Sequence, residues 1–459
     1  MVYNIKLYSA LTYGGLQDNG IIAEYNPATG IHTKKADIFS TGGRWPGSAL
    51  AVCNGKLYGV TAEGGNASGG IIFEYDPVTN IITKKYDFIA NDASGFLPRG
   101  ALTVYNNKLF GMTEKGGADN VGVIFEFDPA TDIYKKCDFV ANTTGNASFA
   151  RLAVYDNKLW GISYYLFNGP AGGTVFSYDP AVNVISPKAA LGTIGLVSHG
   201  FIDLTVLNNK LYGVGGGGAN GFGAIFEFNP ANNLVVNKFH FTNVTGKYEC
   251  NLVALKNKLY GQTDKGGNND KGIIFSYDPV NNEYANKVIM SQNFGHLSLG
   301  SRLTLFNNKL YGWNKFGGAN GQGCLFEYNP VGNSYIKKTE LGTSEVYYPK
   351  GKLLYYNNKI YGTASNTLNF NPNEKSIIYE YDIATNLYTV KVTIPKEDGY
   401  FYEQGGVIMY NNKFYGVSSY GGANNDGVLF EYNPVNNSYT KKYDFKKQTG
   451  SRPYGKLAI

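Results

Sequence analysis

The chain has 459 residues and a formal net charge of +6, and it is rich in glycine (59), tyrosine (38) and phenylalanine (27). This length would ordinarily predict two or three domains, but repeat proteins and large all-β rings are exceptions. Only 17% of the residues are charged and the five arginines are scattered, which excludes a disordered chain, a coiled coil and the clustered basic surface of a nucleic-acid-binding protein.

Neither the ends nor the cysteines indicate a special environment. No stretch of 18 apolar residues is present, so the sequence predicts no membrane-spanning helix. Residues 1–15 lack the charged and apolar regions of a signal peptide, although the mature part of a secreted protein would look the same. The cysteines have no C-x-x-C spacing, and we interpret them as small apolar residues. They are Cys53, Cys137, Cys250 and Cys324.

In chain order, the sequence repeats itself nine times around the motif Lys-Leu-Tyr-Gly. The copies begin at Lys6, Lys56, Lys108, Lys158, Lys210, Lys258, Lys309, Lys359 and Lys413. In the copy at 101–139 we expect four strands, at 101–105, 108–113, 122–128 and 133–139. Asn106-Asn107 forms the first tight turn, a glycine-rich loop precedes the third strand, and residues 129–132 form the last turn.

Four antiparallel strands repeated about every fifty residues predict the blades of a β-propeller. The expected fold class is therefore all-β, a nine-bladed β-propeller of four-stranded antiparallel blades, with residues 1–459 in a single domain. Residues 451–459 match the lead-in and first strand at 97–104, whereas the chain starts at the end of a first strand. We therefore expect the C-terminal strand to complete the N-terminal blade and close the ring, which removes exposed strand edges.

A glycine-rich stretch at 214–226 contains Gly216, Gly218 and Gly221 in the spacing of a dinucleotide-binding loop. Such a loop requires a following helix, whose N-terminus binds the pyrophosphate. A strand-like segment follows here, and paired glycines recur at this position in seven of the nine copies. We interpret the match as a coincidence within a glycine-rich turn, and we predict no cofactor.

The order of an apolar strand, an Asn-Asn-Lys turn, a Lys-Leu-Tyr-Gly strand, a glycine pair and a strand ending in Phe-Glu-Tyr-Asp-Pro resembles the kelch repeat. The tryptophan that opens the last kelch strand is mostly tyrosine or isoleucine here, as at Ile82 and Tyr134. Residues 57–65, Leu-Tyr-Gly-Val-Thr-Ala-Glu-Gly-Gly, more closely resemble the bacterial GloVer tandem repeat. This resemblance implies a propeller on a surface or secreted protein and no particular activity.

Two patterns of charge follow the repeat. Glutamates in the third strand of seven copies are expected to be structural cross-strand partners of lysine. They are Glu24, Glu74, Glu126, Glu227, Glu327, Glu380 and Glu431. Paired lysines in the fourth strand are expected to lie solvated on the outer edge, with a basic binding belt as the alternative. They are Lys34-Lys35, Lys84-Lys85, Lys135-Lys136, Lys337-Lys338 and Lys441-Lys442.

Candidate binding residues lie in the variable loops that lead into the first strands. Variable loops on a rigid scaffold usually carry recognition, and aromatic rings beside polar groups suit sugars or peptides. The predicted ligand-binding residues are Trp45, Phe96, Arg99, Phe149, His199, Tyr248, His296, Tyr348, Tyr402 and Tyr454. The alternative is that these rings fill gaps between neighbouring blades.

Catalytic chemistry finds little support in the sequence. The four histidines belong to different copies, and neither H-E-x-x-H nor G-x-S-x-G occurs, so we predict no catalytic residue and no metal site. Loops such as 266–272 offer too few carboxylates for calcium. A polysaccharide lyase or glycoside hydrolase would need acidic residues that break the repeat. The candidates for that role are Glu249, Glu345, Glu397, Asp398 and Glu403.

The sequence therefore favours a non-enzymatic propeller, secreted or on the cell surface and monomeric, that binds a carbohydrate or a protein through its variable loops. We expect no nucleic-acid partner and no membrane span. A structural spacer or adhesin module without a ligand is the alternative.

Overall fold

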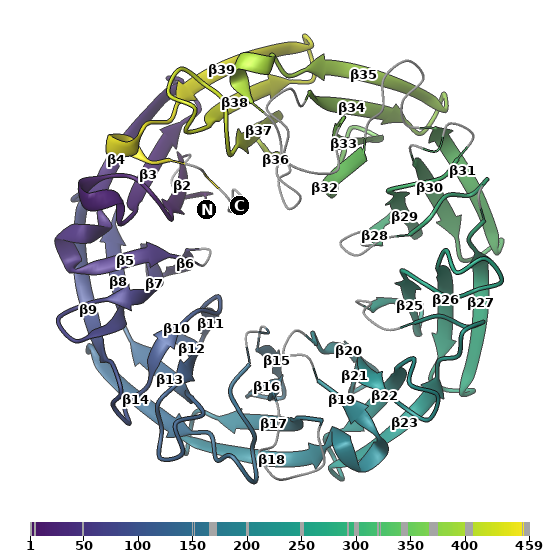
Figure 1. The fold of residues 1–459 in the computed structure, drawn as a ribbon, viewed down its shortest axis with the longest axis horizontal. Coiled ribbons are helices and arrows are strands. Elements are labelled where there is room, and N and C mark those ends of the chain that lie inside the picture. The colour runs from purple at the N-terminus through teal and green to yellow at the C-terminus, as the bar shows by residue number, and fades with distance from the viewer. Residues whose placement is uncertain are drawn as a thin grey trace.

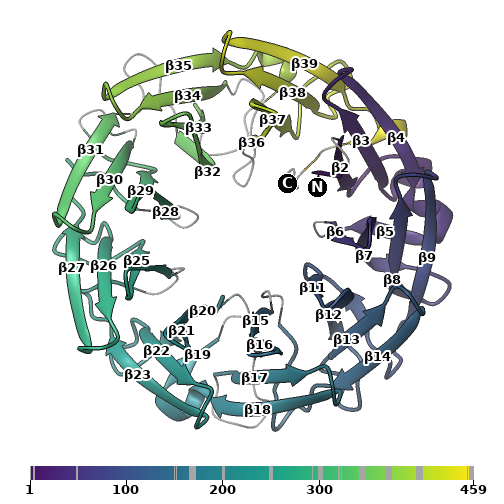
Figure 2. The ribbon, with the colours of Figure 1, turned by 180° about the vertical axis from the view of Figure 1, so that it is seen from behind.

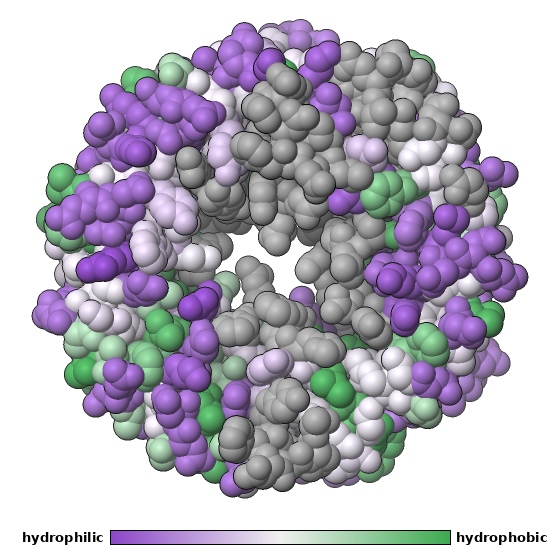
Figure 3. Space-filling view, viewed as in Figure 1, coloured by the Kyte–Doolittle hydropathy of each residue, from purple (hydrophilic) through white to green (hydrophobic). Residues whose placement is uncertain are grey.

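The computed structural model describes residues 2–3, 6–47, 50–148, 150, 152–164, 172–198, 202–247, 252–291, 293–297, 303–318, 321, 323–340, 348–366, 375–399, 407–451 and 453. These residues form nine antiparallel sheets arranged in a ring, so the predicted nine-bladed β-propeller is confirmed (Figures 1 and 2). Among them, no helix is long and apolar enough to cross a membrane. A space-filling view shows an opening at the centre of the ring (Figure 3).

The blades follow one another in chain order. Blade 1 contains β1 (Val2–Tyr3), β2 (Lys6–Leu11), β3 (Ile21–Asn26) and β4 (Ile31–Asp37). Blade 2 contains β5 (Gly43–Pro46), β6 (Ala51–Cys53), β7 (Lys56–Gly64), β8 (Ser68–Asp76) and β9 (Ile81–Ile89). Blade 3 contains β10 (Phe96–Pro98), β11 (Thr103–Tyr105), β12 (Lys108–Lys115), β13 (Val123–Asp128) and β14 (Ile133–Asp138).

The second third of the ring holds blades 4 to 6. Blade 4 contains β15 (Ala153–Tyr155), β16 (Lys158–Ile162), β17 (Thr174–Asp179) and β18 (Val184–Ala190). Blade 5 contains β19 (Leu196–Val197), β20 (Thr205–Leu207), β21 (Lys210–Gly217), β22 (Ala224–Asn229) and β23 (Leu234–His240). Blade 6 contains β24 (Val253–Leu255), β25 (Lys258–Thr263), β26 (Ile273–Asp278) and β27 (Glu283–Ile289).

The last third holds blades 7 to 9. Blade 7 contains β28 (Thr304–Phe306), β29 (Lys309–Asn314), β30 (Cys324–Asn329) and β31 (Ser334–Glu340). Blade 8 contains β32 (Tyr348–Tyr356), β33 (Lys359–Ser365), β34 (Ser376–Asp382) and β35 (Leu387–Thr393). Blade 9 contains β36 (Val407–Tyr410), β37 (Lys413–Ser418), β38 (Val428–Asn433) and β39 (Ser438–Asp444). Short 3₁₀ turns occur at η1 (Leu16–Asp18), η2 (Ile38–Thr41), η3 (Leu191–Ile194), η4 (Lys396–Asp398) and η5 (Lys447–Thr449).

Short turns join the strands on one face of the ring, which we call the turn face. Asn106 and Asn107 have φ angles of 48° and 57°, and two left-handed residues in succession are what a type I′ hairpin turn requires. After the third strand, Asp128 Oδ1 accepts a hydrogen bond from the Ala130 N–H at 2.9 Å, which stabilises the second turn. The opposite face, which we call the loop face, carries the longer loops.

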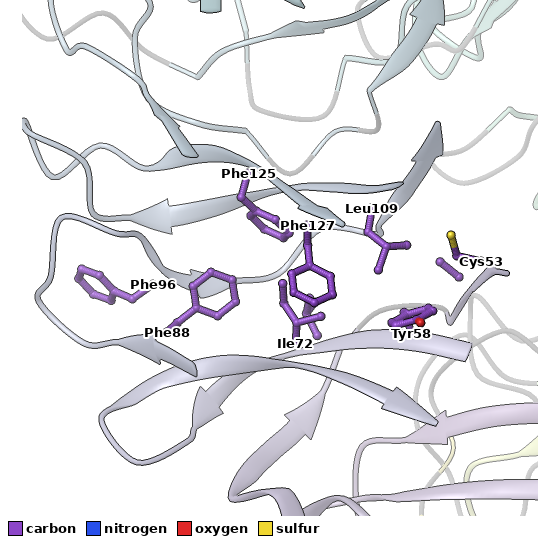
Figure 4. Packing of buried hydrophobic residues seen from close by; sticks show 10 residues of the cluster. Cys53, Tyr58, Ile72, Phe88, Phe96, Leu109, Phe125 and Phe127 are labelled. Atoms are coloured by element: carbon purple, nitrogen blue, oxygen red, sulfur yellow. The ribbon is translucent and has the colours of Figure 1, made fainter. Parts of the chain in front are cut away.

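The hydrophobic core is divided among the nine junctions between neighbouring blades. At the junction of blades 2 and 3, Phe88 packs with Phe125 and Phe127 (Figure 4). Burial of each such side chain contributes about 1.5–3 kcal/mol. Because each blade buries both of its faces in this way, the sheets depend on their neighbours for stability.

Two glycines of the repeat show why the motif needs them. A Cβ on Gly111, the last residue of the Lys-Leu-Phe-Gly motif, would lie 2.4 Å from Cζ of Phe125 on the adjacent strand. Gly116, the first of a glycine pair, has a φ of +95°, and a Cβ there would lie 2.4 Å from Cα of Gly95. The first glycine therefore makes room for a buried ring, and the second allows two backbone segments to meet.

The two ends of the described chain meet where the ring closes. Blade 9 lies next to blade 1, and Ser451 forms an antiparallel bridge with Tyr13 (Figures 1 and 2). However, the innermost position of blade 1 is held by β1, where Val2 pairs with Leu7. The chain's own first residues therefore supply part of the inner strand of blade 1. The expected strand at 456–459 lies outside the described residues.

The glycine-rich stretch at 214–226 forms the end of β21 and the start of β22. A strand follows the glycines, as predicted. The geometry of a dinucleotide-binding loop, with glycines at a helix N-terminus, is therefore not formed in this described segment.

Candidate functional site

The most regular arrangement of charge is a buried carboxylate held by two lysines and a tyrosine. In blade 7, Glu327 Oε1 lies 2.8 Å from Lys309 Nζ, and Glu327 Oε2 accepts a hydrogen bond from the Tyr311 hydroxyl at 2.9 Å. Lys338 Nζ approaches the same Oε2 to 3.1 Å. Burial opposes ionisation of Glu327, but its contacts with Lys309, Tyr311 and Lys338 outweigh burial and leave the pKa of Glu327 below its ordinary value.

The same four-residue arrangement recurs in six blades, and we call it the ionic tetrad. Its members in blades 1, 2, 5, 7, 8 and 9 are Lys6, Tyr8, Glu24 and Lys35; Lys56, Tyr58, Glu74 and Lys85; Lys210, Tyr212, Glu227 and Lys238; Lys309, Tyr311, Glu327 and Lys338; Lys359, Tyr361, Glu380 and Lys391; and Lys413, Tyr415, Glu431 and Lys442. The predicted pairing of these glutamates with lysine is confirmed. A carboxylate whose partners are already supplied by its own blade is structural.

In four of the five predicted lysine pairs of the fourth strand, the second lysine does not lie solvated on the edge as predicted. A register shift in that strand lets the second lysine of the pair point inward, as Lys35 does opposite the shift between Ile22 and Ala23. The side chains of Lys35, Lys85, Lys338 and Lys442 are 8–17% exposed, and each pairs with the glutamate of its own blade. The prediction was wrong for these residues because the register shift turns them toward the buried glutamate.

Three blades depart from the tetrad. Blade 3 keeps Glu126 but has Phe110 in place of the tyrosine and no register shift in its fourth strand. Blades 4 and 6 have Ser177 and Ser276 where the glutamate stands, opposite Trp160 and Tyr260. These departures were not predicted, although the sequence shows the change of Phe-Glu-Tyr to Phe-Ser-Tyr in the third strand of blades 4 and 6.

Five of the predicted ligand-binding residues are described, and the structure places them in different surroundings. Phe149, His199, Tyr248, Tyr402 and Tyr454 lie outside the described residues. Trp45 is 40% exposed in β5, with a φ of 55°. Arg99 pairs on the surface with Glu114, with Nε 3.0 Å from Oε2. Phe96 is only 8% exposed and packs among Phe88 and Phe125, which favours the gap-filling alternative for this ring (Figure 4).

His296 and Tyr348 are brought to the same place by a residue that the sequence analysis missed. The Phe316 ring lies 5.9 Å from the His296 ring and 5.7 Å from the Tyr348 ring, measured between centroids. Lys315 Nζ lies 6.0 Å from the Phe316 centroid. All three rings are half-buried. An aromatic residue directly before the glycine pair, found also at Tyr13 and Tyr420, was the available signal.

The electrostatics of this aromatic group, which we call the loop-face group, favour a neutral imidazole. Burial first, and then the charge of Lys271, lower the pKa of His296 below its ordinary value of 6.5. A neutral imidazole at pH 7 both donates and accepts a hydrogen bond. The group thus combines aromatic surface, one cation and one bifunctional polar ring.

The acidic residues considered for catalysis are only partly described. Glu249, Glu345 and Glu403 lie outside the described residues. Asp398 is 3% exposed, accepts a hydrogen bond from the Tyr439 hydroxyl at 3.0 Å and lies 2.9 Å from Lys441 Nζ. Both carboxylate oxygens therefore have structural partners. In the described part of the chain, no group of three or more His, Cys, Asp or Glu side chains could hold a metal ion.

Comparison with known proteins identifies the repeat. A family model described as the Gloeobacter/Verrucomicrobia repeat matches residues 3–176 and 168–374. No curated protein sequence matches the chain. A chain from a structural and mechanistic study of two prolyl endopeptidases is similar at 11% identity and a TM-score of 0.43. That match covers 84% of this chain and 54% of that one, so this chain spans about half its length.

A structural match at that identity and TM-score gives no information on the chemistry of this chain. None of these matches confirms the resemblance to the kelch repeat. The family model, in contrast, covers most of the nine copies. The chain therefore belongs to the Gloeobacter/Verrucomicrobia repeat family.

Proposed function

We propose that this propeller is a non-enzymatic module, secreted or on the cell surface and monomeric, that binds a carbohydrate through its loop face. The observation that supports this most is the loop-face group of His296, Phe316 and Tyr348, whose rings stand together and keep part of their surface open to solvent. Aromatic faces stack on the C–H surfaces of sugars, and Lys315 with a neutral imidazole supplies hydrogen bonds to hydroxyl groups.

A non-enzymatic role fits the way the acidic residues are used. The glutamates of the ionic tetrads are buried and paired, and Asp398 is held by Tyr439 and Lys441. Catalysis by carboxylates needs one or two groups with free oxygens that face a substrate. The tetrad glutamates and Asp398 instead have their carboxylate oxygens paired with side chains of the protein itself.

The test is a panel of neutral oligosaccharides, screened first by thermal shift and then by saturation-transfer NMR. A sugar present at one hundred times its Kd adds about 2.7 kcal/mol of stability, which raises Tm. Phe316→Ala should weaken sugar binding about tenfold, because the sugar can no longer stack on the phenylalanine ring. Tyr105→Ala is the matched control, since Tyr105 is a half-buried ring on the turn face.

Two results would contradict the proposal. One is that no oligosaccharide binds, which would favour the spacer or adhesin alternative. The other is that Phe316→Ala and Tyr105→Ala weaken binding equally, which would place the sugar elsewhere.

A protein ligand is the second candidate. Trp45 is 40% exposed on β5 and stands beside the exposed Arg44. Tryptophan and arginine are enriched among the residues that dominate protein interfaces. A protein partner captured by the wild type and lost on Trp45→Ala, with sugar binding unchanged, would favour this candidate.

A further inference from the structure

A cleft of about 430 Å³ opens between blades 4 and 5 on the turn face. Its walls come from the hairpin turn and second strand of blade 4, the hairpin turn of blade 5 and the turn after β22. It lies on the face opposite the loop-face group, so it stands independently of the proposed function above. Clefts of about 300–1,000 Å³ are the usual size for small-molecule sites.

The cleft lies where blade 4 departs from the ionic tetrad. Lys158 and Lys188 occupy the two lysine positions of the tetrad, and both line the cleft. Ser177 takes the place of the glutamate, and Trp160 opposite it takes the place of the tyrosine. The Trp160 indole N–H donates to the backbone oxygen of Tyr155 at 2.9 Å, which holds the ring against the first strand.

The two lysines are therefore left without the carboxylate that their equivalents share. Lys158 Nζ lies 3.6 Å from Oδ2 of Asp179, the last residue of β17. Among the described residues, no acidic side chain lies within ion-pair distance of Lys188. A third lysine of the cleft, Lys210, is already paired with Glu227 at 2.6 Å. One carboxylate, Asp156, also lines the cleft at its hairpin turn.

The charge state of Lys188 agrees with this geometry. Partial burial first, and then the positive charge of Lys158, lower the pKa of Lys188 below its ordinary value. Lys158 has Asp179 as a counter-charge at 3.6 Å but Lys188 has none among the described residues, and a cation without a counter-charge favours the binding of an anion. In six other blades the protein itself supplies that anion as a buried glutamate.

We propose that this cleft binds the carboxylate of an acidic sugar, a uronic acid residue, between Lys158 and Lys188. The ligand carboxylate takes over the role of the missing glutamate, and a carboxylate between two ammonium groups forms charge-assisted hydrogen bonds. Asn208, Asn209 and Asn229 line the same cleft, and asparagine amides form hydrogen bonds of the kind that sugar hydroxyl groups need. The Tyr155 ring supplies an apolar wall.

Blade 6 provides a natural comparison within the same chain. It also has serine at the glutamate position, Ser276, and a lysine at the register shift, Lys287. There, however, Asp278 is only 8% exposed and lies 3.2 Å from Lys258, which is closer than the corresponding contact in blade 4. Substitutions of Ser276 and Lys287 are therefore matched controls for those of Ser177 and Lys188, at a junction where we propose no ligand.

The experiment measures binding of D-glucuronate to the full chain by saturation-transfer NMR, with D-glucose, acetate and inorganic phosphate as comparison probes. Glucuronate should bind, and D-glucose should not. Ser177→Glu places an internal carboxylate between the two lysines and should weaken glucuronate binding about tenfold or more. Lys188→Met removes one cation and keeps most of the apolar stem, and it should have a similar effect. Ser276→Glu and Lys287→Met should leave binding unchanged.

Each remaining outcome overturns the proposal or a part of it. If glucuronate does not bind, or if Lys188→Met and Lys287→Met affect it equally, the cleft is not the site. If acetate or phosphate binds as tightly as glucuronate, the site takes a simple anion and the sugar assignment is wrong. Because Ser177→Glu could fail to fold, Lys188→Met, with its melting temperature compared with that of the wild type, decides in that case. The Phe316→Ala experiment with neutral sugars tests the loop face, so its result does not bear on the cleft.

Discussion

Blades 7 and 4 have the same strand order but differ in how they balance charge. In blade 7, the Glu327 carboxylate contacts Lys309, Tyr311 and Lys338, and the residue is 1% exposed. In blade 4, Ser177 is equally buried, but the two lysines around it face an open cleft. A single change from glutamate to serine in a repeat can therefore turn a structural ion cluster into a place for an external anion.

The largest expected effect comes from removing the charge of a complete tetrad. Glu327→Gln keeps the size of the side chain but leaves Lys338, whose side chain is 8% exposed, without its counter-charge. Breaking a buried ion pair from one side costs about 3–5 kcal/mol, and we expect a loss of about 3 kcal/mol in the free energy of unfolding by guanidinium. Ser177→Ala in blade 4 should cost about 1 kcal/mol or less. Equal losses would remove the distinction between the two blades.

A second, smaller effect is a dependence of stability on pH. The pKa values of Glu24, Glu327 and Glu431 lie below the ordinary 4.5, because their lysine and tyrosine contacts outweigh the effect of burial. The folded pKa is lower than the unfolded one, so the stabilisation is complete above about pH 4.5 and is lost as the pH falls through the folded pKa. Melting temperature measured from neutral to acidic pH should fall less steeply in Glu327→Gln than in the wild type. Parallel curves would mean that Glu327 contributes no proton linkage.

The smallest effect comes from completing the tetrad of blade 4. Without ligand, Ser177→Glu should raise the free energy of unfolding by about 1 kcal/mol or less, since the new carboxylate gains two lysine partners but also loses its hydration. Blade 3 shows that glutamate is tolerated without the tyrosine, because Glu126 there stands opposite Phe110. The change is measured by guanidinium unfolding. A large destabilisation by Ser177→Glu would show that Trp160 already fills the space that the glutamate side chain needs.

Much of the fold could be predicted from the sequence because it depends on short-range chemistry. Asn106-Asn107 specifies a left-handed hairpin turn, and Gly111 leaves room for Phe125, wherever the blade stands in the ring. Repetition of these signals predicted the number of blades. The pairing of Glu327 with lysine was also predictable, since both residues lie on neighbouring strands.

The candidate sites were less predictable because they depend on contacts between blades. His296, Phe316 and Tyr348 meet although Phe316 belongs to a loop that was not considered. For Phe96 the sequence left open ligand binding or gap filling, and the structure places it in the junction of blades 2 and 3. Neither result follows from spacing within one repeat.

The sequence by itself determined the repeat, its turns and the residues that each blade contributes, because these are properties of about fifty neighbouring residues. Only the tertiary structure decided which lysine of the fourth strand points inward, since a register shift reverses the alternation there. It also decided that β1 holds the inner edge of blade 1. Lys188 became a candidate ligand residue for the same reason. Its surroundings are completed by residues of blade 5, which packs against blade 4 through contacts between repeats.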